Sequence, residues 1–202
     1  MPFEKHLPST DINRLLVSPN FADNPNQELR RLDSSGGMDD LEIEEAFEQA
    51  AANERERIIR NIQERVTEYE VHLGLPLYQE RIDLIAHQTL KTLSDINSAL
   101  LDFKEMHGQI AAQNERLFSQ VGMDVKLGDS AIDEIIRIAV DQDRDIGEIC
   151  LSLANELEYG LRLVKDRIGC ESFALTKEAV LDPEKYIESL IKKCYSQDSL
   201  IS

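Results

Sequence analysis

Apolar residues recur every three or four positions over most of this chain, a spacing typical of amphipathic helices. The first such stretch covers residues 39–73, where Asp39 and Asp40 suit a helix start and Gly74 and Pro76 end the pattern. Its apolar stripe is thin, and Glu, Arg, Gln and Asn cover the remaining surface. A helix with so narrow an apolar face is predicted to need a partner for stability.

A second helical stretch begins near Leu77 and extends to Val121. Its apolar positions alternate mostly in steps of three and four, which is the spacing of a coiled-coil seam. The seam consists of Ile82, Ile85, Thr89, Leu93, Ile96, Leu100, Phe103, Ile110, Leu117 and Val121. Because few residues join the two stretches, we expect a long antiparallel helical hairpin over residues 39–121. Two uses of the seam stay open: closure within a monomeric bundle, or binding of a second copy or another protein.

The segment 122–195 combines two kinds of pattern. Short alternating runs, Met123–Leu127 and Ser172–Leu175, predict strands, and a helical spacing returns after each. Asp129 or Ser130 is predicted to cap the helix that follows the first strand. The positions expected to be buried on its first two helices are Ala131, Ile132, Ile135, Ile136, Ala139, Val140, Ile146, Ile149, Cys150, Leu153, Leu157, Leu161 and Val164. We therefore predict a mainly α protein in which this segment forms a small α+β domain with a minor two-stranded sheet.

The two ends of the chain have a different composition. Residues 1–38 are rich in Pro and contain a Ser-Ser-Gly-Gly run, which predicts a mobile N-terminal arm, and residues 196–202 form a C-terminal tail. One short amphipathic piece of the arm carries Leu15 and Leu16. This piece is either part of a flexible tail or a docking peptide for another protein.

The net charge and the apolar runs of the chain bear on the class of partner that it can bind. The 202 residues carry a formal net charge of −17, so the protein repels phosphate backbones and anionic lipid headgroups. No apolar run approaches the roughly 20 residues that cross a bilayer. We therefore expect no nucleic-acid and no membrane partner.

The three cysteines follow no zinc or redox spacing, which favours free thiols in a reducing compartment, the cytoplasm by default.

No residue pattern predicts a reaction or a cofactor. The carboxylates from Asp141 to Asp145 begin like a calcium loop, but the twelfth position is Ser152 where a bidentate Glu is needed. Asp83 and His87 lie four residues apart, which is more typical of a surface pair than of a metal site. For either cluster to act in acid–base or metal chemistry, it would have to converge with residues far away in sequence. We predict no catalytic, cofactor or metal site.

The C-terminal segments GMDVKLGDSAIDEIIRIA and SFALTKEAV, with Ile146-Gly147 between them, resemble the small C-terminal lid subdomain of Clp- and HslU-type AAA+ ATPases over residues 122–193. In that family, an arginine reaches the nucleotide phosphates, and a glycine lies two residues before this arginine. Here Gly147 is followed by Glu148 and Ile149, and no phosphate-binding loop of the G-x-x-x-x-G-K-[ST] type occurs in the chain. The resemblance implies a lid without nucleotide chemistry of its own.

Two functions follow as hypotheses. The first is a non-enzymatic helical protein–protein interaction or assembly module, which binds its own copies as a homo-oligomer or binds other proteins. Its predicted contact residues are Leu15, Leu16, Leu93, Ile96, Leu100 and Phe103. The alternative is a lid-bearing fragment of an AAA+ unfoldase-type ATPase whose nucleotide-binding core lies outside this chain.

Overall fold

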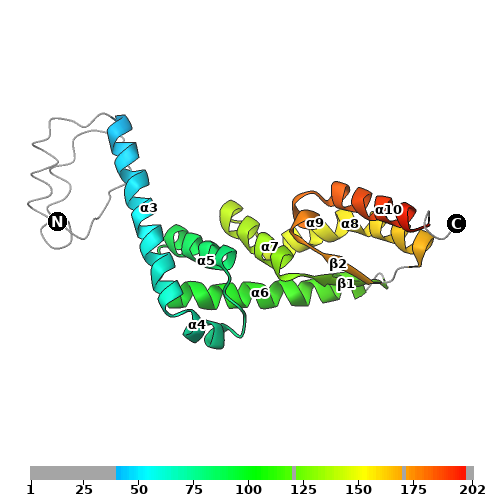
Figure 1. Cartoon of the computed structure of the whole chain (residues 1–202), viewed down its shortest axis with the longest axis horizontal. Coiled ribbons are helices and arrows are strands. Elements are labelled where there is room, and N and C mark those ends of the chain that lie inside the picture. The colour runs from blue at the N-terminus through cyan, green and yellow to red at the C-terminus, as the bar shows by residue number, and fades with distance from the viewer. Residues whose placement is uncertain (1–39, 120–121, 170–171, 199–202) are drawn as a thin grey trace, which may run out of the picture. The chain divides into compact units, whose positions relative to one another are not determined.

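The computed structural model describes residues 40–119, 122–169 and 172–198 (Figure 1). Contacts divide the chain after Arg57, and the second compact unit, Ile58–Ser202, contains the core described below. The position predicted as a domain boundary, between residues 121 and 122, falls inside this unit. The predicted N-terminal arm, with Leu15 and Leu16, lies outside the described residues.

The described residues form helices with one small sheet, which confirms the mainly α class with a minor two-stranded sheet. In chain order the elements are α3 (Asp40–Glu64), α4 (Val66–Leu73), α5 (Gln79–Thr92), α6 (Ile96–Ser119), β1 (Asp124–Leu127), α7 (Asp129–Gln142), α8 (Ile146–Ile168), β2 (Ser172–Leu175), α9 (Lys177–Leu181) and α10 (Pro183–Asp198). None of the helices within these described ranges combines the length and the apolar character needed to cross a membrane.

Each of the two predicted long helices is interrupted, so the prediction of two continuous helices is wrong at these points. The first breaks at Arg65, whose ψ of 19° lies outside the helical range. The second breaks at Leu93, which has a left-handed φ of 52°. Asp95 then starts a new helix, because its Oδ1 accepts hydrogen bonds from the backbone N–H groups of Asn97 and Ser98 at 2.9 and 3.1 Å.

Helices α5 to α8 form two similar pairs, which we call the first helical pair (α5–α6) and the second helical pair (α7–α8). In both pairs the first helix has 14 residues and ends in a left-handed cap, and an Asp precedes the second helix. Matching positions differ by a constant offset, as in Ile82 and Ile132 or Asp95 and Asp145. Helix α5 packs on α7 and α6 packs on α8, while α9 and α10 cover α7 and α8 in turn. The unit is therefore a stack of helical pairs.

The strands β1 and β2 are parallel, with Val125 opposite Phe173, and the second helical pair connects them. Side chains close both outer edges of this sheet. Asn114 Nδ2 of α6 donates to the Val125 carbonyl at 2.7 Å, and the Tyr186 hydroxyl of α10 donates to the Ala174 carbonyl at 2.9 Å. One outward carbonyl of each strand thus has a hydrogen-bond partner within the chain.

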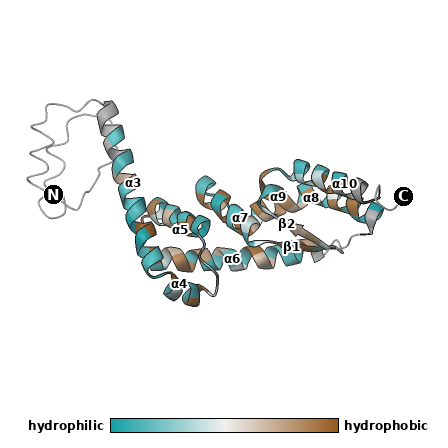
Figure 2. Ribbon diagram, in the orientation of Figure 1, coloured by the Kyte–Doolittle hydropathy of each residue, from teal (hydrophilic) through white to brown (hydrophobic). Residues whose placement is uncertain are grey.

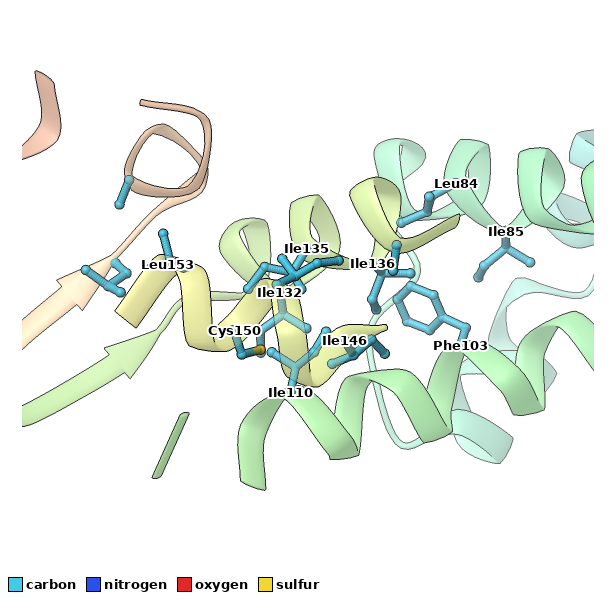
Figure 3. Packing of buried hydrophobic residues seen from close by; sticks show 14 of the residues in the cluster. Leu84, Ile85, Phe103, Ile110, Ile132, Ile135, Ile136, Ile146, Cys150 and Leu153 are labelled. Atoms are coloured by element: carbon cyan, nitrogen blue, oxygen red, sulfur yellow. The ribbon is translucent and has the colours of Figure 1, made fainter. Parts of the chain in front are cut away.

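The core of this unit is mainly aliphatic and includes Val125, Phe173 and Leu175 of the strands. Hydrophobic and hydrophilic residues alternate along its helices (Figure 2). Figure 3 shows side chains of α6, α7 and α8 gathered around Ile110, Ile132, Ile146 and Cys150. The positions predicted to be buried on α7 and α8 are confirmed, except that Val140 is only partly buried. The predicted capping of α7 by Asp129 or Ser130 is wrong: Gly128 occupies the N-cap position, and both residues belong to the helix.

Candidate protein-interaction surface

The structure places the predicted contact residues of α5 and α6 in different environments. Leu100 and Phe103 are fully buried among residues of the same unit, and Ile96 is partly buried against that core. Leu93, in contrast, is 90% exposed. Of these four side chains, Leu93 is the one that another protein can reach without any opening of the core. The protein-binding role of the set stays a prediction.

Leu93 combines this exposure with an unfavourable backbone conformation. It forms the C-cap of α5 with φ 52° and ψ 33°, and its backbone N–H donates to the Thr89 carbonyl. A left-handed conformation costs a residue with a Cβ atom about 1–2 kcal/mol. The matching residue of the second helical pair is Asp143, a residue type that tolerates this conformation better. Leu93 therefore carries a backbone cost that no burial of its side chain offsets.

An open groove runs along α6, opposite the turn between α7 and α8. It consists of two adjoining hollows with volumes of about 620 and 370 Å³, which share Gln109, Asp145 and Ile146. Its lining comprises Gln88, Lys91, Thr92, Asp102, Glu105, Met106, Gln109, Ala112, Gln113, Arg116, Ala139, Val140, Asp143, Arg144, Asp145, Ile146 and Gly147. From Asp102 to Arg116 the groove follows α6 for about 20 Å. Thr92, which directly precedes Leu93, lies at its border.

The groove lining carries charges of both signs, with Asp102, Glu105, Asp143 and Asp145 on one side of the balance and Lys91, Arg116 and Arg144 on the other. Among the residues that the structure describes, Asp102, Glu105 and Asp143 take part in no ion pair. Lys91 is engaged at the C-terminal end of α7, where its ammonium group donates to the carbonyls of Val140 and Asp141.

One residue of the groove lining has a buried polar atom without a partner. Gln88 is only 3% exposed, and its Oε1 has no hydrogen-bond partner in the described part of the protein. A buried carbonyl oxygen in this state costs about 1–3 kcal/mol. Met106 and Ile146 add apolar surface beside it. The groove thus combines charged side chains of both signs with a small apolar area.

A buried ion pair joins the two helical pairs. The fully buried Arg81 of α5 donates from Nε to Asp133 of α7 at 3.1 Å and from Nη1 to the Pro76 carbonyl at 2.8 Å. Its guanidinium also stacks over the rings of Tyr78 and Phe103, 4.7 and 5.4 Å from their centroids. These contacts satisfy the charge within the protein, which is typical of a structural ion pair.

Two titratable groups border this ion pair. Burial and a hydrogen bond to Asp133 raise the pKa of the Tyr78 hydroxyl, which keeps it protonated. Burial and the nearby Arg81 charge lower the pKa of His107, whose Nε2 lies 3.9 Å from Asp129 Oδ1. A protonated tyrosine and a neutral histidine beside a paired arginine suit a structural role.

The structure brings together two clusters that are separate in the sequence. The Nε2 atom of His87 on α5 lies 2.8 Å from Oδ1 of Asp141 on α7. Arg137 contacts the second oxygen of Asp141, also at 2.8 Å. The ring of His87 is 46% exposed, and in the described ranges no group of three or more His, Cys, Asp or Glu side chains is arranged to hold a metal ion. These contacts link α5 to α7 at the surface.

The sequence analysis missed the groove because its walls come from α5, α6 and the α7–α8 turn. Gly147, the residue to which the lid resemblance draws attention, lies at one end of the groove in the first turn of α8. Comparisons of the chain with protein-family models, with curated proteins and with solved structures give no match.

Proposed function

We propose that this chain is a non-enzymatic protein–protein interaction module, and that its binding surface consists of the groove along α6 together with Leu93. The observation that supports this proposal most strongly is Leu93, a leucine that is 90% exposed in a left-handed backbone conformation. Unusual conformations of this kind are concentrated at functional sites, where another requirement maintains them.

Binding of a partner would offset the cost of that conformation. Transfer of a leucine side chain from water into an apolar contact contributes about 1.5–3 kcal/mol. The groove extends this contact, since an elongated hollow bordered by polar groups suits a polypeptide segment. The partner is either a second copy of the chain, giving a homo-oligomer, or another protein. Because the chain has a net charge of −17, nucleic acids and anionic membranes are unfavourable partners. A cytoplasmic location is part of this proposal.

Site-specific photo-crosslinking tests the proposal. A photo-reactive amino acid is placed at Gln109 in the groove, and in a control protein at Asp166, an exposed residue of α8 outside the groove lining. We expect a discrete product with one additional polypeptide from the Gln109 position alone. An excess of untagged wild-type chain should reduce this product, and an excess of the Leu93→Asp variant should not.

Two results would overturn the proposal. One is the absence of any crosslinked polypeptide at Gln109. The other is the same set of products from Gln109 and Asp166, which would indicate unspecific contacts. Sedimentation of the wild-type chain over a range of concentrations then shows whether the partner is the chain itself.

A second candidate is the lid-bearing fragment of an AAA+ unfoldase-type ATPase. In its favour, the second helical pair connects two parallel strands, and Gly147 lies in the first turn of α8. This function would consist of contacts between subunits, with the nucleotide chemistry elsewhere. A continuous reading frame that encodes a phosphate-binding loop upstream of Met1 would support it, and a translation start signal directly before Met1 would count against it.

A further inference from the structure

We infer that His107 is a proton-sensitive element of the joint between the two helical pairs, by which we mean the contact of α7 with α5 and α6. When this imidazole gains a proton below neutral pH, the packing at the joint weakens. The basis is a cluster of side chains that three helices bring together, with His107 on α6, Arg81 on α5, and Asp129 and Asp133 on α7. The proposed interaction function plays no part in it.

The imidazole of His107 is largely enclosed at this joint. Its side chain is 16% exposed, and its Nε2 atom is buried without a hydrogen-bond partner in the part of the chain that the structure describes. The fully buried ring of Phe103 lies beside it, with a centroid 6.3 Å from that of the imidazole. A neutral imidazole suits such a site, because it carries no charge that has to be withdrawn from water.

Within the described residues, the charged groups that act on His107 are Arg81 of α5 and the two carboxylates of α7. The carboxylate of Asp133 is already engaged, since Arg81 Nη2 lies 2.9 Å from its Oδ1 and the Tyr78 hydroxyl donates to its Oδ2. Asp129 Oδ1 lies 3.9 Å from Nε2 of His107, which is too far for a hydrogen bond. The Asp129 side chain is also half exposed, so water screens its charge.

A proton on His107 would therefore add a second buried cation next to Arg81. Both ring nitrogens of a charged imidazole are donors, and Nε2 has no acceptor within hydrogen-bonding distance. Burial, and after it the charge of Arg81, lower the pKa of His107, while Asp129 and Asp133 act in the opposite direction. The folded protein consequently holds this proton less tightly than the unfolded chain does.

The direction of the pH dependence follows from this difference. Because the pKa of His107 is lower in the folded state, its contribution to stability is fully present above the pKa of the unfolded chain, about 6.5. The contribution is lost as the pH falls from that value through the pKa of the folded state. Ordinary Asp and Glu side chains titrate near pH ~4, so mild acid leaves them charged and isolates the effect of histidine.

An NMR titration of the imidazole signals and urea unfolding test the inference. The His107 signal is identified by its absence in His107→Gln. Unfolding curves are measured at pH ~7.5 and ~5.5 for the wild type, for His107→Gln and for a control variant. The control is His72→Gln, which makes the same substitution at an exposed residue of α4. Hydrogen exchange of the α5 and α7 amides at the same two pH values shows where the protein loosens.

We expect the wild type and His72→Gln to unfold at a lower urea concentration in mild acid, and His107→Gln to lose less. The α5 and α7 amides of the wild type should lose protection in mild acid relative to those of His107→Gln. Asp129→Asn should shift the titration of His107 to still lower pH, because it removes a carboxylate that favours the proton.

An equal acid loss in the wild type and in His107→Gln would overturn the inference, and so would a titration of His107 at or above the pKa of an unfolded chain. Unchanged protection of α5 and α7 would also contradict it, since the loosening would then lie elsewhere. If His107→Gln does not fold, the titration of the wild type decides, with the His107 signal assigned by through-bond correlation. A histidine with an unshifted pKa cannot couple pH to stability.

Discussion

The buried guanidinium of Arg81 lies with its Nη2 atom 2.9 Å from Oδ1 of Asp133, and this ion pair connects α5 to α7. It is a buried electrostatic link between the first and the second helical pair, because each pair contributes one charge. Its loss would leave an uncompensated carboxylate against an apolar core. The groove also depends on this contact, since α5 and α7 both contribute to its walls.

We predict that Arg81→Met lowers the free energy of unfolding by about 3–5 kcal/mol, because it leaves the Asp133 carboxylate without the guanidinium that pairs with it. Urea denaturation followed by circular dichroism measures this loss. Arg162→Met is the control, since Arg162 pairs with Glu158 on the surface at 2.7 Å and its removal should change stability far less. Similar losses for both variants would contradict a structural role of the buried pair.

Gly160→Ala should destabilise the protein although alanine favours helices. A Cβ atom at this position would lie 2.7 Å from Cγ1 and Cγ2 of Ile187, so α8 and α10 would have to separate. Overpacking of this kind costs about 1–3 kcal/mol. At Gly108 no atom lies within 4 Å of the added Cβ, and there Gly108→Ala should stabilise the chain by up to about 1 kcal/mol. We expect Gly160→Ala to lower the melting temperature and Gly108→Ala to raise it. A higher melting temperature for Gly160→Ala would show that the α8–α10 contact is looser.

Leu93→Asn should raise the free energy of unfolding by about 0.5–1 kcal/mol, because asparagine adopts the left-handed conformation at lower cost and no buried contact is lost. Leu101→Asn serves as the control, since Leu101 is also exposed but lies inside α6. This control should bring no gain. Destabilisation by Leu93→Asn would mean that Leu93 packs within its own chain, and the argument for its role in binding would fail.

The Cys150 thiol makes the free energy of unfolding depend on pH in the alkaline range. Burial, assisted by the Asp145 charge, raises the pKa of Cys150 from 9.0 to about 11. The folded state therefore holds this proton more tightly than the unfolded state. This contribution to stability is fully present below the pKa of the thiol in the unfolded state. It is lost as the pH rises through the pKa of the thiol in the folded state, by roughly 2–3 kcal/mol in total. Unfolding curves of wild type and Cys150→Ala between pH ~8 and ~11 should show a smaller alkaline loss in the variant, and parallel curves would refute the assignment.

The second helical pair shows how much of the fold a pattern can predict. Its apolar positions follow a helical spacing without interruption, Asp145 caps α8 by accepting the Glu148 N–H, and Gly169 ends that helix in a left-handed conformation. Local residues thus define the start and end of α8. The strands were predictable for the same reason, since alternation and flanking glycines are local properties. Their parallel pairing was not, because it depends on the path of α7 and α8.

The break at Leu93 shows where the pattern misleads. Leucine continues the apolar stripe of α5 into α6, so spacing alone predicts an unbroken helix with Leu93 in its seam. The signal against it was Asp95-Ile96, which repeats the Asp145-Ile146 start of α8 at the constant offset. The groove had no comparable signal. Gln88, Asp102 and Asp143 become neighbours of one hollow only when the two helical pairs stack.

The side-chain amide of Asn114 and the hydroxyl of Tyr186 have a consequence for the kind of assembly that this protein can enter. With a carbonyl on each flank of β1 and β2 already occupied, a third strand would first have to displace these donors. Growth of the sheet from molecule to molecule, the route to fibres, is thereby disfavoured. An association of the proposed kind would then use surfaces that recognise a partner by its side chains.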